Sequence, residues 1–178
     1  MTDPAYAEDL PGFGPFALVR LDPARDRDLV HGWVSQPRAR FWGMTEHSPE
    51  VVQEIYEFVD GLATHHAYLM RLAGTPVGIF QTYEPAADPI GEYYEVRDGD
   101  FGIHLFLAPA QQPVPGFLGA VAGALLRFAF AHPGTKRIVI EPDIHNERAL
   151  IRWRSLGFVF DAVVTTPDKT AQLAFLSR

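Results

Sequence analysis

The chain has 178 residues, of which 47% are hydrophobic, so it suits one domain with a sizeable core and is not expected to be disordered. Its 15 Lys and Arg against 22 Asp and Glu give a formal net charge of −7, and a surface for nucleic-acid phosphates is therefore not expected. The absence of cysteine excludes disulfides, thiolate metal ligands and a cysteine nucleophile.

Residues 1–15 are polar and rich in Pro and Gly, which predicts a mobile N-terminal arm ahead of a single domain over residues 16–178. This segment has neither the basic region nor the apolar core of a signal peptide. No apolar run reaches the roughly 18–20 residues that a membrane-spanning helix needs. The sequence therefore predicts a cytoplasmic protein without a membrane partner.

The first part of the domain predicts a strand followed by two helices. Residues 16–21 are mostly apolar and indicate the strand. An Asp-Pro pair opens residues 22–34 and a Ser-Pro pair opens residues 48–62, and both pairs are typical of a helix N-cap followed by proline at the first helical position. Residues 35–47, between the helices, show no period.

The middle of the chain predicts three strands, a long loop and an apolar helix. Residues 66–72 and 76–83 indicate a hairpin. Residues 84–98 are rich in Pro, Gly and acids and indicate a long loop, and loops of this length are usually functional or disordered. Residues 99–107 predict a strand, and residues 117–131 an almost wholly apolar helix.

The C-terminal part predicts a strand, a short helix and two more strands. Residues 137–141 are rich in β-branched side chains and indicate a buried strand. Asn146 suits the N-cap of the following helix, and Gly157 can take the positive φ that ends it. Residues 158–163 then begin a strand, and residues 171–176 predict the last one.

This order resembles that of the GNAT acyltransferases, in which an Asn opens the last helix and a Gly-Phe pair closes it. The chain also resembles the GNAT branch that acylates hydroxylamines in hydroxamate siderophore biosynthesis, a part of iron acquisition. The resemblance covers roughly Phe16 to the C-terminus and is carried by four motifs, His31-Gly32-Trp33-Val34, Arg40-Phe41-Trp42-Gly43-Met44, Gly102-Ile103-His104-Leu105 and Ile140-Glu141-Pro142-Asp143. It implies an α/β (α+β) fold with a mixed, mostly antiparallel twisted sheet, a splayed parallel strand pair and helices on both faces.

The resemblance further implies an acyl-coenzyme A co-substrate, such as acetyl- or succinyl-coenzyme A, and no metal is expected because the histidines show no ligand spacing with carboxylates. Taken alone, residues 112–119 indicate a plain helix start, and Pro113 and Pro115 remove two amide donors. By resemblance this turn binds the pyrophosphate, and the implied cofactor-binding residues are Phe106, Leu107, Gly116, Phe117, Leu118, Gly119 and Asn146. In this scheme an amide near Phe106 or Leu107 donates to the developing oxyanion.

Two side chains are candidates for the chemistry. His104 lies on a predicted strand, where a lone His is more often structural than catalytic, although Gly102 beside it leaves room for a ligand. Asp143 follows a strand, and its carboxylate suits either a turn or catalysis. By resemblance His104 is the general base and Asp143 the second catalytic residue. Glu141 could take either role, but its place within a strand favours a structural one.

The implied reaction transfers an acyl group to the hydroxylamino nitrogen of an N-hydroxylated diamine or of N6-hydroxylysine, and gives a hydroxamate. Aromatic residues could wall this small-molecule substrate, namely Trp33, Phe41, Trp42, Tyr83 and Tyr93, although those within residues 35–47 could equally cap the core.

Two other functions stay open. One is a GNAT enzyme that acts on a different amine, such as an aminoglycoside, a polyamine or a ribosomal N-terminus. The other is a GNAT-like domain that binds acyl-coenzyme A without catalysis. The sequence also leaves a homodimer open.

Overall fold

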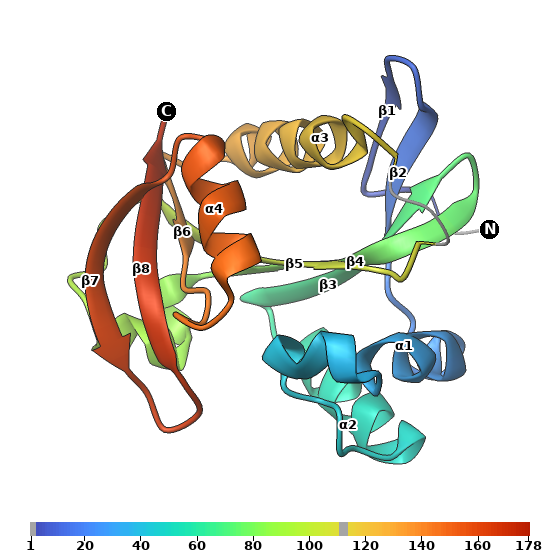
Figure 1. The fold of residues 1–178 in the computed structure, drawn as a ribbon, viewed down its shortest axis with the longest axis horizontal. Helices are drawn as coiled ribbons and strands as arrows, with labels where there is room; N and C mark the ends of the chain where they lie inside the picture. Colours follow the sequence, from blue (N-terminus) through green and yellow to red (C-terminus); the bar gives the residue numbers. More distant parts are fainter. Residues whose placement is uncertain (1–2, 111–113) are drawn as a thin grey trace. The chain divides into compact units, whose positions relative to one another are not determined.

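The computed structural model describes residues 3–110 and 114–178 (Figure 1). Eight strands form one mixed sheet in the order β1-β2-β3-β4-β5-β6-β8-β7. The chain divides into two compact units, one of Met1–Gln81 with Leu105–Phe128 and the other of Thr82–His104 with Ala129–Arg178. Among the described residues, no helix is both long and apolar enough to cross a lipid bilayer.

The predicted strands and helices are present, with one additional strand at the N-terminus. The strands are β1 (Tyr6–Leu10), β2 (Gly14–Arg20), β3 (His65–Leu72), β4 (Thr75–Tyr83), β5 (Asp100–Leu107), β6 (Arg137–Ile140), β7 (Val159–Thr165) and β8 (Thr170–Ser177). The helices are α1 (Arg27–Val34), α2 (Pro49–Asp60), α3 (Phe117–Ala131) and α4 (Glu147–Ser155), with short 3-10 turns η1 (Pro37–Trp42), η2 (Pro85–Ala87) and η3 (Pro89–Glu92).

The predicted N-terminal arm needs correction from Tyr6 onward, because β1 pairs antiparallel with β2. Leu10 is buried, and Glu8 forms an ion pair with Arg127 of α3 at 2.7 Å. Arg127 is so distant in sequence that the residues around Glu8 carry no local sign of this contact. The Pro and Gly residues of the segment instead favour a loop. Residues 1 and 2 of the predicted arm lie outside the described residues.

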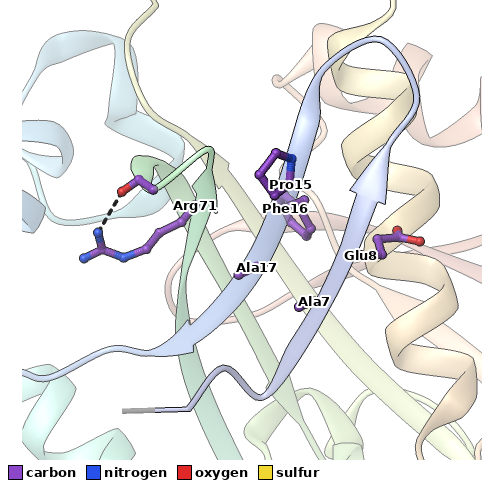
Figure 2. A pocket seen from close by; sticks show the side chains of 7 residues that line it. Ala7, Glu8, Pro15, Phe16, Ala17 and Arg71 are labelled. Carbon is purple, nitrogen blue, oxygen red and sulfur yellow. Dashed lines mark hydrogen bonds between the residues drawn. The ribbon is translucent and has the colours of Figure 1, made fainter. Parts of the chain in front are cut away.

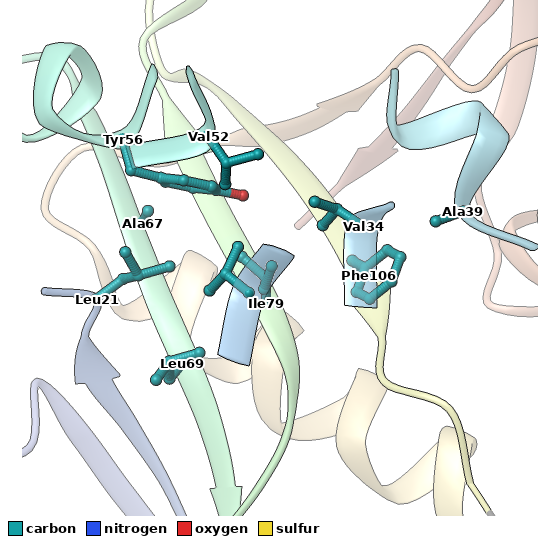
Figure 3. Close-up of a cluster of buried hydrophobic side chains, with 10 residues drawn as sticks. Leu21, Val34, Ala39, Val52, Tyr56, Ala67, Leu69, Ile79 and Phe106 are labelled. Atoms are coloured by element: carbon teal, nitrogen blue, oxygen red, sulfur yellow. The ribbon is translucent and has the colours of Figure 1, made fainter. Parts of the chain in front are cut away.

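In the first unit, side-chain alternation along β3 sends neighbouring residues to opposite faces of the sheet. Tyr68 meets the Phe128 ring of α3, with ring centroids 5.6 Å apart. Leu69 points the other way, into a core formed with α1 and α2 (Figures 1 and 3). The buried members of this core are Leu21, Val30, Val34, Ala39, Val52, Tyr56, Ala67, Leu69, Ile79 and Phe106.

The two predicted helix starts differ in outcome. The Ser48 hydroxyl accepts from the Val51 amide at 3.3 Å, so the predicted N-cap of α2 is confirmed. The first helix begins at Arg27, later than predicted, because Asp22 instead closes a turn by accepting from the Arg25 amide at 2.9 Å. An Asx turn competes with a helix start for the same side chain, and here the turn forms.

In the second unit, β5 and β6 are parallel but pair only over Asp100–Gly102 and Arg137–Val139. β6 ends at Ile140, one residue beyond this pairing, whereas β5 continues to Leu107, and the splaying of the pair stays a prediction. The Asn146 side chain caps α4 by accepting from the Ala149 amide at 3.3 Å.

Residues 84–98 form an anchored loop that contains η2 and η3. The Tyr94 hydroxyl donates to Asp100 at 3.0 Å, and Asp100 also pairs with Arg137 at 2.6 Å. Both side chains of this ion pair are largely buried. The loop is thus tied to the strands on which the candidate site is built.

Candidate active site

A histidine and a glutamate meet just beyond the last paired residues of β5 and β6. His104 Nε2 contacts Glu141 Oε1, and the pairing of the two strands ends at Gly102 and Val139. The Glu141 side chain is only 7% exposed, whereas that of His104 is 35% exposed. The imidazole can therefore be reached by a ligand, and the carboxylate lies behind it.

Two further side chains converge on Glu141. The Tyr83 hydroxyl, from the end of β4, donates to Glu141 Oε2 at 2.6 Å. Lys169, in the turn before β8, places its Nζ 3.5 Å from Oε1. Segments far apart in the sequence thus supply one hydrogen-bonded cluster, which we call the Glu141 cluster and define as Tyr83, His104, Glu141 and Lys169.

The cluster keeps the carboxylate ionised. Burial alone would raise the pKa of Glu141, but the charge and hydrogen bond of His104, the charge of Lys169 and the hydrogen bond of Tyr83 outweigh it and lower that pKa. Burial, followed by the nearby Glu141 charge, raises the pKa of Tyr83, so its hydroxyl stays protonated and can donate. At neutral pH the pair is therefore an anionic carboxylate beside an imidazole.

Asp143, the predicted second catalytic residue, occupies a turn. Its carboxylate accepts from the His145 amide at 2.7 Å and pairs with the His145 ring at 2.9 Å. Its backbone forms an isolated bridge with Ala171. Asp143 thus has the turn role that the sequence left open. The carboxylate that contacts His104 is that of Glu141.

The space expected beside Gly102 is occupied. A Cβ added to Gly102 would overlap the Tyr83 ring, so glycine is required here by a neighbouring side chain. The prediction that Gly102 leaves room for a ligand is therefore wrong, because the side chain of Tyr83 on β4 fills that space.

The aromatic side chains proposed as a substrate wall lie mainly in cores. Tyr83 is 2% exposed, and Tyr93 packs against the same small cluster in the second unit. In the first unit Trp33 and Trp42 pack against the main core, and for Trp42 this is what the core-capping interpretation of residues 35–47 predicts. Phe41 is partly exposed, and the Arg40 guanidinium lies 4.5 Å from its ring centre.

The predicted pyrophosphate turn is described from Val114 onward, and Gln112 and Pro113 lie outside the described residues. Gly116 has a φ of 78°, and the Phe117 amide donates to the Val114 carbonyl at 3.2 Å. The Phe117 amide is therefore engaged in the turn. The amides of Leu118 and Gly119 belong to the first helical turn, where N–H groups have no partner within the helix and can serve an anion.

The other residues predicted for the cofactor have structural contacts of their own. The Phe106 side chain is buried in the core of the first unit, and the Leu107 carbonyl accepts from Arg38 at 3.1 Å. Asn146 caps α4, and this structural role explains the residue without any contact to a cofactor. Contacts of the amides at Phe106 and Leu107 with an oxyanion stay a prediction.

A separate surface hollow of about 340 Å³ lies near the β1–β2 and β3–β4 turns (Figure 2). It is lined by Ala7, Glu8, Pro15, Phe16, Ala17, Arg71 and Gly74, and none of these was predicted to be a site residue. The described residues contain no group of three or more His, Cys, Asp or Glu side chains that could hold a metal ion.

Comparison with known proteins identifies the class of protein. The acetyltransferase (GNAT) domain family matches residues 22–166. The chain is 27% identical over 158 residues to aminoglycoside N(6′)-acetyltransferase type 1 of Klebsiella pneumoniae, covering 86% of this chain and 79% of the relative. It is 29% identical over 131 residues to N-hydroxyputrescine acetyltransferase of Acinetobacter baumannii, covering 72% and 61%.

A solved structure agrees with these matches. AAC(6′)-Ib in complex with paromomycin and acetyl-coenzyme A superposes with a TM-score of 0.80 at 28% identity, covering 92% of this chain and 93% of that one. The chain belongs to the GNAT acetyltransferase family. It is thus an acetyltransferase of the GNAT type, with an acyl-coenzyme A as the donor substrate.

Proposed function

We propose that the protein transfers an acyl group from acyl-coenzyme A to the hydroxylamino nitrogen of an N-hydroxylated diamine or of N6-hydroxylysine. The product is a hydroxamate of the kind used in siderophores. One observation carries the proposal, namely that an accessible imidazole is paired with a carboxylate that stays ionised. The Glu141 cluster therefore offers a single proton acceptor, His104.

In the proposed reaction the acceptor nitrogen attacks the thioester carbonyl and forms the new C–N bond. His104 takes the proton that this nitrogen loses, and the buried negative charge of Glu141 stabilises the resulting imidazolium. The C–S bond then breaks, and the coenzyme A sulfur leaves with that proton. The net products are one hydroxamate and one free thiol.

Proton counting favours a hydroxylamine acceptor. An alkylammonium has a pKa of about 10.4, so it must lose one proton before attack and a second during attack. A hydroxylamino nitrogen is much less basic and is already neutral at neutral pH, so only the second proton has to be accepted. Because Glu141 has a lowered pKa and is a poor proton acceptor, one imidazole suits the hydroxylamine better.

An aminoglycoside amine is the second candidate acceptor. It is favoured by the similarity to aminoglycoside N(6′)-acetyltransferase type 1 and by the superposition on AAC(6′)-Ib. The similarity to N-hydroxyputrescine acetyltransferase favours the hydroxylamine at a comparable level of identity. These two sequence identities are too similar to distinguish the two acceptors, so the choice between them depends on the chemistry of the site.

A panel of matched acceptors tests the proposal. We expect N-hydroxycadaverine or N6-hydroxylysine to be acylated with a kcat/KM at least about tenfold above that of cadaverine or lysine at neutral pH, because only about one in 10³ alkylamines is unprotonated there. Thiol release and mass spectrometry of the products, with acetyl- and succinyl-coenzyme A, provide the readout.

The panel also includes kanamycin. Faster turnover of kanamycin than of either N-hydroxylated acceptor would contradict the proposal and support the second candidate. Binding of acyl-coenzyme A without turnover of any acceptor would support a non-catalytic binding domain instead. If the parent amines react as well as their N-hydroxylated forms at neutral pH, the proton-counting argument fails.

A further inference from the structure

The two oxygens of Glu141 are held by different donors. Tyr83 donates to Oε2 at 2.6 Å, while His104 and Lys169 share Oε1. A carboxylate held at only one oxygen can rotate about its terminal torsion, which is a soft one. A donor fixed on Oε2 therefore determines where Oε1 points, and Oε1 is the atom that contacts the imidazole.

Tyr83 is itself rigidly placed. Its ring fills the space over Gly102, and its centroid lies 4.9 Å from that of the His104 ring. On its other sides it packs in a buried cluster with Ile90 and Leu173. Such packing leaves the ring little freedom, so the direction of its hydroxyl is set by β5 and β8.

Lys169 is also held in place, through its backbone. Its amide donates to the Thr166 hydroxyl at 3.2 Å, and its carbonyl accepts from the Thr166 amide at 2.9 Å. The turn between β7 and β8 thus fixes the start of the lysine side chain. That side chain is 29% exposed, and its ammonium lies 3.5 Å from Glu141.

We infer that Tyr83 and Lys169 are positioning residues for acyl transfer, which hold Glu141 so that its Oε1 stays directed at the His104 imidazole. This inference rests on the proposed role of His104 as the base. It assigns to Tyr83 a role different from a wall of the substrate site, since its hydroxyl is directed at the carboxylate. It also assigns a role to a turn residue that the sequence did not single out.

The arrangement has an electrostatic consequence. The charge of Lys169 and the hydrogen bond of Tyr83 help to keep the Glu141 carboxylate ionised, so the negative charge beside His104 persists at neutral pH. Burial and the Glu141 charge raise the pKa of Tyr83, and the charges of Asp88 and Tyr94 add to this effect, so its hydroxyl remains a donor. Removal of Tyr83 or Lys169 as a partner should leave Glu141 less firmly directed at the imidazole, and so lower kcat without weakening the binding of acetyl-coenzyme A.

The test compares Tyr83→Phe, Lys169→Met and Lys169→Arg with the wild-type protein, using acetyl-coenzyme A and the fastest acceptor of the panel. We expect Tyr83→Phe and Lys169→Met each to lower kcat by roughly tenfold, the effect of losing one hydrogen bond or charge at a charged group. The KM for acetyl-coenzyme A should stay within about twofold of the wild-type value. Lys169→Arg should restore most of kcat.

Tyr94→Phe is the matched control, because it removes a tyrosine hydroxyl that donates to a different carboxylate, Asp100. It should leave kcat within about twofold of the wild-type value, while Tyr83→Phe and Lys169→Met each lower it by roughly tenfold. An unchanged kcat in both test variants would overturn the inference. So would a loss of kcat of the same size in Tyr94→Phe.

The outcome for His104→Ala separates this inference from the proposed function. If His104→Ala is inactive and the Tyr83 and Lys169 variants resemble wild type, only the positioning roles are wrong. If His104→Ala retains full activity, His104 is not the base, and Tyr83 and Lys169 then have no positioning role in acyl transfer. Thermal unfolding of each variant verifies that the compared proteins are folded.

Discussion

Replacement of His104 by alanine should lower kcat by about 10²–10⁴-fold, the usual contribution of a positioned general base. The imidazole is the most exposed member of the Glu141 cluster, and the Glu141 carboxylate, whose pKa is lowered, is a poor proton acceptor at neutral pH. Binding of acetyl-coenzyme A should persist, because the phosphate contacts are expected at the start of α3. Steady-state kinetics and titration calorimetry together measure both effects.

His145→Ala is the matched control for this prediction. His145 is also a histidine of the second unit, but its side chain is 75% exposed and pairs with Asp143. Its removal should change kcat only slightly. Equal losses in the two variants, or a wild-type kcat in His104→Ala, would show that the base lies elsewhere.

The second large effect is expected for Glu141→Gln, which should lower kcat by roughly 10²-fold or more. A neutral amide can still accept a hydrogen bond, but it does not stabilise the imidazolium that forms when His104 takes a proton. It also leaves the ammonium of Lys169 without its carboxylate partner. The comparison of kcat with that of the wild-type protein, at matched thermal stability, measures this loss.

Asp143→Asn distinguishes the two carboxylates that the sequence offered. Asp143 accepts from His145 and shapes the turn into α4, so an asparagine, which can still accept from that amide, should cost less than about tenfold in kcat. A larger loss in Asp143→Asn than in Glu141→Gln would instead favour the sequence-based assignment of Asp143 as the second catalytic residue.

The C-terminal half of the fold was predictable because its signals are local. A side-chain cap at Asn146 and a positive φ at Gly157 mark the two ends of one short helix, and both are observed. The strand before this helix is rich in β-branched residues, and its partner strand was expected to separate from it. These features depend on a few neighbouring residues, and sequence patterns express them well.

The N-terminal hairpin and the partner of His104 depend instead on distant contacts. Glu8 is stabilised by an arginine of α3, and Gly102 is required by a tyrosine on the adjacent strand. Glu141 and Asp143 are two positions apart around a proline, so periodicity cannot tell which carboxylate reaches the imidazole. Only the contacts of Tyr83, His104 and Glu141 with one another in the second unit resolve that choice.

The central claim is that His104 and Glu141 act as one unit, and a double-mutant cycle tests it most directly. The measurement is kcat for His104→Ala, Glu141→Gln and the double variant, with the fastest acceptor of the panel. Residues that act together show strongly non-additive losses, so the double variant should be no slower than the slower single variant. Losses that multiply in the double variant would show that the two side chains act independently and would contradict the account.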